Sequence, residues 1–94
     1  MRVHLEFFGL SRLSTSTKEI VLDLEEGTAF RDIVRLLAAK YPKLLENVIK
    51  PDGETLQHPN RFNLNARRMI QPSQMDECPS DGDQIILMSV SAGG

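Results

Sequence analysis

The sequence predicts an α+β fold in which one main helix packs on one face of a mixed β-sheet. Hydrophobic residues alternate with a period of two along 2–8 and 19–24, and a period of 3.6 follows along 30–41. Alternation returns closer to the C-terminus, in strands that must join the same sheet. The economical arrangement of this order is one sheet with the helix across it. A length of 94 residues fits a single domain.

The first two strands are predicted from apolar residues that point to one side only. One side carries Val3, Leu5, Phe7, Ile20, Leu22 and Leu24, and the other carries Arg2, His4, Glu6, Glu19, Val21 and Asp23. Phe8 falls on the polar side, so it is either a strand-end residue under a loop or an exposed apolar contact. The segment 9–17 is rich in Ser, Thr and Gly, and we interpret it as a connection.

The main helix follows Glu26-Gly27-Thr28, where Thr28 is the expected N-cap. Pro42 ends the helix because it disfavours helical angles at the residue before it. The apolar stripe predicts packing against the sheet, and it comprises Phe30, Ile33, Val34, Leu37, Ala38 and Tyr41.

The second half of the chain is predicted as short elements separated by turns. The segment 44–49 can form a helical turn, and the strand 84–89 is apolar on both faces, which indicates a central place in the sheet. The remaining predictions are a turn at 50–53, a polar loop to 60, a strand at 62–65, a turn at 66–68, a strand at 69–70, an irregular segment at 72–81 and a tight turn at 80–83.

The sheet face away from the helix is predicted to be partly apolar. If Ile85 and Leu87 point to the helix, then Ile86, Met88 and the off-pattern Phe8 point the other way. A monomer normally avoids such an exposed patch. Two interpretations stay open: a partner-binding surface, or coverage by the segment 43–60.

Composition excludes several functional classes. Thirteen acidic and eleven basic side chains are interspersed, which gives no basic footprint for nucleic acid. The hydrophobic fraction of 40% does not favour a membrane protein. Cys78 is the only cysteine and the N-terminal residues lack a signal-peptide core, so we expect a cytoplasmic protein. We expect no metal site, no cofactor bound by the chain, and no catalytic acid/base pair.

The sequence ends on Gly93-Gly94, and glycine can pass through channels that other residues cannot enter. Together with the 80–83 turn and the strand that follows it, this dipeptide indicates a reactive terminus.

The whole chain resembles the MoaD/ThiS family of ubiquitin-like sulfur carriers. The resemblance is carried by the first strand 3–9, the helix after Glu26-Gly27-Thr28, Asn65, and the block 81–87 followed by Gly93-Gly94. It implies a β-grasp domain over 1–90 and a free tail over 91–94. It also implies a carrier that is not itself an enzyme, although it can be the small subunit of a synthase.

In this family, an adenylating enzyme similar to ubiquitin-activating enzymes uses ATP to activate the terminal carboxylate, which a sulfur donor converts to a thiocarboxylate. The resemblance implies that Gly94 carries the sulfur and Gly93 gives slim access. It implies partner binding through Phe8, Ile86, Met88 and Ala92, and a downstream synthase large subunit or acceptor enzyme as partner.

Molybdopterin biosynthesis is the preferred pathway at this point. The approach Met88-Ser89-Val90-Ser91-Ala92 departs from the Pro-Pro-Val type that is common in molybdopterin synthase small subunits, and the stretch 42–60 is longer than in the shortest thiamine-type carriers. Carriers for cysteine or thiamine synthesis therefore stay open. So do a modifier joined to target lysines, and an interaction module with an inert tail.

Overall fold

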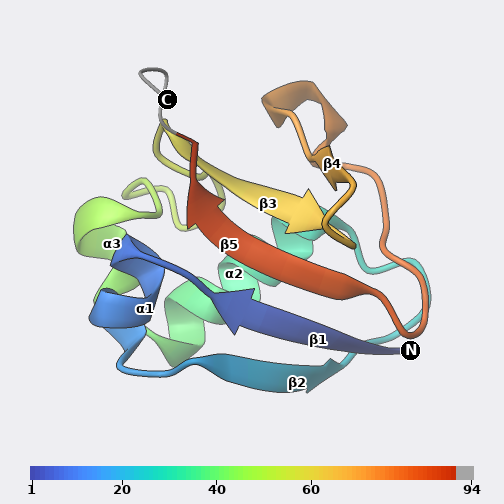
Figure 1. Ribbon diagram of the computed structural model, residues 1–94. Coiled ribbons are helices and arrows are strands. Elements are labelled where there is room, and N and C mark those ends of the chain that lie inside the picture. The colour runs from blue at the N-terminus through green and yellow to red at the C-terminus, as the bar shows by residue number, and fades with distance from the viewer. Residues whose placement is uncertain (91–94) are drawn as a thin grey trace.

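The structure, a computed structural model, describes residues 1–90 and consists of one five-stranded sheet with helices on one side (Figure 1). Strand order is β2-β1-β5-β3-β4, so the last strand in sequence is the central one. The strands are β1 (Arg2–Phe7), β2 (Glu19–Asp23), β3 (Asn60–Leu64), β4 (Arg68–Met69) and β5 (Gln84–Ser89). The helices are α1 (Leu10–Thr15), α2 (Phe30–Lys40), α3 (Leu44–Asn47) and the 3-10 turn η1 (Pro72–Gln74).

The sheet is mixed, as the sequence predicts. β1 and β5 pair in parallel, and the pairs β1–β2, β3–β5 and β3–β4 are antiparallel. The parallel pair is possible because a long crossover, which includes α2, separates the two strands in sequence. In Figure 1, α2 runs behind the sheet and no helix crosses the face turned to the viewer.

The core lies between α2 and the sheet, and it uses the residues that the two periodicities select. Phe30 and Phe62 pack with ring centroids 6.0 Å apart, and Phe7 meets the edge of Tyr41 at 5.4 Å. The buried apolar residues are Val3, Leu5, Phe7, Leu24, Phe30, Ile33, Val34, Leu37, Ala38, Leu44, Val48, Ile49, Phe62, Ile70, Met75, Ile85 and Leu87. The predicted inward faces of β1, α2 and β5 are therefore confirmed.

Two local predictions are wrong. The segment 9–17 is not a simple connection, because Leu10–Thr15 form helix α1. Thr28 does not cap α2: its hydroxyl donates to the Glu25 carbonyl at 2.7 Å, and Ala29 occupies the N-cap. The Asp32 carboxylate accepts from the Ala29 N–H at 2.9 Å instead, so an acidic side chain of the first turn satisfies this amide.

The segment 43–60 packs on the same side of the sheet as α2. Leu44, Val48 and Ile49 are fully buried members of the core, and α3 makes its element contacts with α1 and α2. This segment leaves Phe8 exposed on the opposite face. Coverage of that face by 43–60 is therefore wrong.

Candidate partner interface and the root of the C-terminal tail

The sheet face opposite α2 carries an apolar patch near the end of β5. We call this patch, formed by Phe8, Ile86 and Met88, the open-face patch. Phe8 is 56% exposed, and the other two side chains are half-buried. Phe7 is in register with Leu87, so the next step of the parallel pairing places Phe8 beside Met88. The structure thus brings together three of the sequence-predicted binding residues.

Three neighbours of the open-face patch were missed by sequence reasoning. Arg61 is in register with Met88, while Asn63 is in register with both Ile86 and Met69. The Asn63 amide nitrogen lies 3.6 Å from the Met69 sulfur, and its Oδ1 is buried without a hydrogen-bond partner among the described residues. For Asn63 the alternation around buried Phe62 was the available signal, since it assigns position 63 to this face.

Phe8 is held at the strand end by a serine that the sequence did not single out. The Phe8 N–H donates to the Leu87 carbonyl at 3.1 Å and to the Ser11 hydroxyl oxygen at 3.2 Å. The buried Ser11 hydroxyl in turn donates to the Leu87 carbonyl at 2.9 Å. Gly9, with φ 67°, then turns the chain into α1. These contacts fix the backbone of Phe8 while its ring stays exposed.

Charged groups surround the open-face patch and continue along the same face. Glu6 is in register with Ile86 and with Glu19 across two neighbouring strands. Farther along, Arg2 donates to Asp23 at 2.9 Å, and this hydrogen bond raises the pKa of the Arg2 guanidinium above its ordinary value. Both partners are exposed, so the pair contributes little to stability. An apolar centre with a charged surround is the usual composition of a protein interface.

The root of the tail lies beside the start of β3. Ser89 is in register with Asn60, and the Val90 N–H donates to the Pro59 carbonyl at 2.8 Å. The chain is therefore anchored up to Val90. The predicted site residues Ala92, Gly93 and Gly94 lie outside the described residues.

The turn before β5 is fixed at three points. Asp83 accepts from the Ser80 N–H at 2.7 Å and from the Asn65 amide at 3.0 Å, and Gly82 has φ 86°. Asn65 also accepts from the Gln84 N–H at 2.8 Å. Asn65 and the 81–87 block, two parts of the sequence resemblance, are thus directly joined.

Residues 1–90 carry few features that would support another kind of site, such as a metal centre. That range contains no group of three His, Cys, Asp or Glu side chains placed to hold a metal ion. The exposed Cys78 thiol donates to the Gly27 carbonyl at 3.3 Å. Within the same range, no helix is sufficiently long and apolar to span a bilayer.

Comparison with known proteins identifies a relative of this chain by sequence. No protein-family model matches the chain. Its sequence is 30% identical to small archaeal modifier protein 3 of Haloferax volcanii, over 94 residues that span 100% of both chains.

Solved structures show the same fold. SAMP1, a small archaeal modifier protein of Haloferax volcanii, superposes with a TM-score of 0.79 at 19% identity, over 100% of each chain. A putative molybdopterin converting factor, subunit 1, from Pyrococcus furiosus has a TM-score of 0.72 at 21% identity, over 94% of this chain and 95% of that one. The fold is the ubiquitin-like β-grasp.

Proposed function

Since the chain belongs to the ubiquitin-like family of small archaeal modifier proteins, whose structural neighbours include MoaD-type sulfur carriers, we propose that it acts as a sulfur carrier through Gly94. The observation that carries the proposal is the match to a modifier protein along the entire length of both chains. The anchored tail root beside an apolar surface supports it. In this proposal the carboxyl group of Gly94 is the group that is activated, and Gly93 gives it slim access.

The proposed chemistry takes place at one carboxyl group. A carboxylate oxygen of Gly94 attacks the α-phosphorus of ATP and pyrophosphate leaves, which gives an acyl-adenylate. A sulfide-level sulfur from a donor then attacks the carbonyl carbon, AMP leaves, and a thiocarboxylate results. ATP and its magnesium ion are held by an adenylating enzyme of the ubiquitin-activating type, and the chain itself binds no cofactor. Because the reaction consumes ATP, we assign it to the cytoplasm.

Partner binding is proposed to use the open-face patch, continued by Ala92 of the tail. Phe8 provides an exposed aromatic ring, and Met88 is an adaptable neighbour. Such a centre can dock first on the adenylating enzyme and later on an acceptor, because both must receive the same tail. The partners are therefore the adenylating enzyme, the sulfur donor, and a synthase large subunit or other acceptor.

The test of sulfur loading is intact mass spectrometry after incubation with ATP, a sulfur donor and the adenylating enzyme of the same host. We expect the mass change of one oxygen replaced by sulfur. A chain without Gly94 should show no change, and Gly94→Ala tests whether the terminal position accepts a Cβ. If the native chain retains only its carboxylate while an established carrier is converted in the same assay, the proposal is wrong.

Molybdopterin synthesis is the pathway we propose for the sulfur. The support is the structural likeness to a protein described as a putative molybdopterin converting factor subunit. The thiocarboxylate form should lose its sulfur when the host's molybdopterin synthase large subunit and precursor are added. If the thiocarboxylate loses its sulfur only to a cysteine-forming or a thiamine-forming enzyme, the chain serves that pathway instead.

A second candidate function is protein modification, which the name of the 30% identical relative favours. A lysine amine can attack the same activated carbonyl, with AMP as leaving group. Because the last basic residue is Arg68, trypsin would leave a long remnant, so we suggest the variant Ser91→Arg. Modified host lysines should then carry Ala-Gly-Gly, and a Gly94-deleted form of this variant should give none. If no such remnants are found in cells in which the chain is loaded with sulfur, conjugation is excluded.

The remaining alternative is an interaction module with an inert tail. It predicts that removal of Gly93 and Gly94 leaves function intact. Either tail-dependent reaction above would contradict it.

A further inference from the structure

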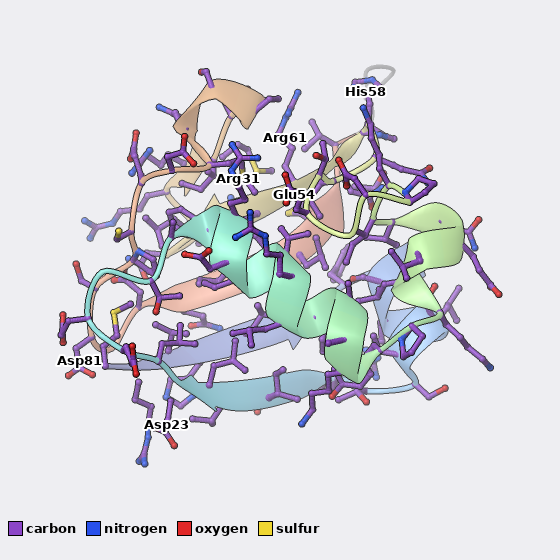
Figure 2. All side chains as sticks on the ribbon, turned by 180° about the vertical axis from the view of Figure 1, so that it is seen from behind. Asp23, Arg31, Glu54, His58, Arg61 and Asp81 are labelled. Atoms are coloured by element: carbon purple, nitrogen blue, oxygen red, sulfur yellow. The ribbon has the colours of Figure 1, made fainter. Side chains whose placement is uncertain are left out.

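A small cavity lies behind the tail root, on the α2 side of the molecule. It has a volume of about 190 Å³, and we call it the loop pocket. The loop 50–60, the start of α2, the start of β3 and the segment 70–75 form its walls. In the view from behind, Arg31, Glu54, His58 and Arg61 gather at this end of the molecule (Figure 2).

The loop pocket combines apolar walls with a cationic lining. Ile70 and Met75 are buried, and Leu56 is half-buried, so part of the wall is fixed by the core. Three basic residues also line the cavity, namely Arg31, Lys50 and Arg61, against one acidic residue, Glu54. With His58 neutral, the lining residues alone have a formal excess of two positive charges, and Asp76, outside the lining, pairs with one of them, Arg31.

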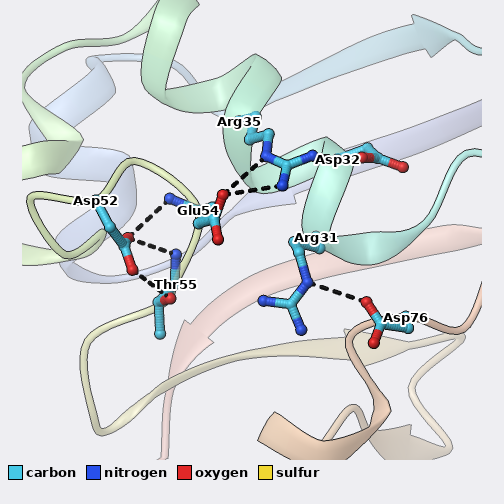
Figure 3. Close-up of polar contacts among 7 residues, drawn as sticks. All are labelled: Arg31, Asp32, Arg35, Asp52, Glu54, Thr55 and Asp76. Carbon is cyan, nitrogen blue, oxygen red and sulfur yellow. Dashed lines mark hydrogen bonds and ion pairs between the residues drawn. The ribbon is translucent and has the colours of Figure 1, made fainter.

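The carboxylates around the loop pocket are already engaged. Glu54 Oε2 accepts from Arg35 Nε at 3.1 Å and from Arg35 Nη2 at 2.9 Å, contacts that raise the pKa of Arg35 (Figure 3). Asp52 accepts from the Glu54 and Thr55 backbone N–H groups and from the Thr55 hydroxyl. Lys50 acts on Asp52 only as a minor influence on its pKa.

The cations retain unused donors. Arg31 Nε donates to Asp76 at 3.0 Å, and Figure 3 shows its two terminal nitrogens directed away from Asp76. Neither Lys50 nor Arg61 forms an ion pair within residues 1–90. The amides at the start of α2 are not available, because the Phe30 and Arg31 N–H groups donate to carbonyls of 75–77. Any anion would therefore be held by side chains.

We propose that the loop pocket binds a free phosphate-class oxyanion, such as inorganic phosphate. A divalent anion matches the excess of two charges, and planar guanidinium groups suit phosphate oxygens. The cavity volume of about 190 Å³ corresponds to roughly six water molecules at about 30 Å³ each, so the loop pocket has room for phosphate. This site differs from the open-face patch in its ligand and in most of its lining, although Arg61, in register with Met88, borders both.

The loop pocket lies close to the root of the tail. His58 and Asn60 line the cavity, and Pro59 between them accepts the Val90 N–H. An anion in the pocket therefore lies beside the backbone contact that anchors the tail root. The proposal does not depend on sulfur transfer, because the chain without sulfur on Gly94 should bind the anion in the absence of any partner protein.

The test is a nuclear magnetic resonance titration of the 94-residue chain with sodium phosphate, with ionic strength held constant by sodium chloride. We expect saturable shifts of amide signals in 50–61 and 70–75. Arg31→Gln and Arg61→Gln should each weaken binding by about tenfold, because each removes a charged hydrogen-bond donor. Arg12→Gln is the control: it removes the same charge from an exposed position on α1.

Two results would overturn the proposal. One is shifts that do not saturate or that persist with unchanged affinity in the Arg31 and Arg61 variants. The other is acetate of equal ionic strength binding as tightly as phosphate, which would show that the pocket does not select a divalent oxyanion. Urea unfolding of each variant ensures that a lost signal reflects the site. If Arg31→Gln does not fold, Lys50→Gln, at an exposed position, replaces it.

Discussion

Phe8 shows how one side chain can serve an interface without serving the core. Its ring is 56% exposed, whereas its backbone is bonded to Leu87 and Ser11. We expect Phe8→Ala to change the free energy of unfolding by less than about 0.5 kcal/mol. The same change should weaken binding to the adenylating enzyme by about 2 kcal/mol or more, as loss of a central aromatic anchor does.

Calorimetric titration against the adenylating enzyme, together with urea unfolding, measures the two effects. Leu36→Ala is the matched control, because Leu36 is 46% exposed on α2, on the other side of the molecule. Equal affinities of the two variants would contradict the assigned role of Phe8.

Ser11 has the opposite character, since it is buried and acts through its hydroxyl. It bridges the end of β1 to the Leu87 carbonyl of β5. We expect Ser11→Ala to lower the free energy of unfolding by about 1–2 kcal/mol, because a buried hydrogen bond is lost. Ser14→Ala on the same helix should change it by less than about 0.5 kcal/mol. Similar urea midpoints for the two variants would show that the bridge is dispensable.

Asp52 gives a residue-level dependence on pH. Hydrogen bonds from the Glu54 N–H and from Thr55 lower its pKa below the ordinary value of about 4. A lowered pKa in the folded state stabilises the protein above the unfolded-state pKa, and this contribution is lost as pH falls through the folded-state pKa. Asp52→Asn should therefore be less stable at pH 7 and lose less stability in acid. Parallel stability curves for the two proteins would contradict this assignment.

The turn that connects β3 and β4 requires a left-handed backbone at two residues. Asn65 and Ala66 have φ of 55° and 58°, and the Arg67 N–H donates to the Leu64 carbonyl at 3.0 Å. Asn65 tolerates this left-handed backbone and also binds Asp83 and Gln84. Ala66 accepts the same conformation with no compensating side-chain bond.

These differences predict an order of stability. Asn65→Gly should cost about 1–2 kcal/mol for the lost side-chain hydrogen bonds, and Asn65→Ala should cost about 1 kcal/mol more because of its Cβ. Ala66→Gly should stabilise the protein by up to about 1 kcal/mol, since it relieves the same strain. Urea unfolding of the three variants checks the order, which fails if Asn65→Ala is as stable as Asn65→Gly.

Elements with strong periodicity were predictable, and elements decided by tertiary contacts were not. The stripe from Phe30 to Ala38 is sufficient to identify α2 and its buried face. Helix α1 has only six residues, and its Ser and Thr content is typical of a loop. The Ser11 hydroxyl bonds it to the Leu87 carbonyl of β5, a contact that the sequence does not show. The cap of α2 was misassigned because Thr28 and Asp32 both suit a helix start, and only the fold selects between them.

At the scale of the whole molecule, β5 joins the two halves of the sheet. It pairs with β1 on one side and β3 on the other, and it supplies Ile85 and Leu87 to the core. A chain ending at Val90 should unfold within about 0.5 kcal/mol of the native chain, because the described core is complete at that point. A chain ending at Asp83 lacks β5 and should not fold.

Circular dichroism during urea unfolding distinguishes these two truncations. A marked loss of stability in the 1–90 chain would contradict the predicted division into a domain over 1–90 and a separate tail. A cooperative transition in the 1–83 chain would contradict the central role of β5.

As with the helices and strands, the sequence could predict one part of the candidate sites and not another. Phe8, Ile86 and Met88 were accessible because alternation assigns each residue to a face. Arg61, Asn63 and the loop pocket depend on which strands become neighbours and on how the 50–60 loop meets residues 70–75. Such proximity between distant segments is a property of the fold.

The parallel pairing of β1 with β5 also has a consequence for the order of synthesis. The ribosome makes β1 first and β5 last, so the newly made β1 must wait for its central neighbour until the entire sheet sequence has been translated. The domain cannot close around its core before that moment. A partner that recognises Phe8 together with Met88 would therefore find its surface only after β5 has been made, so partner binding has to follow the synthesis of residues 84–89.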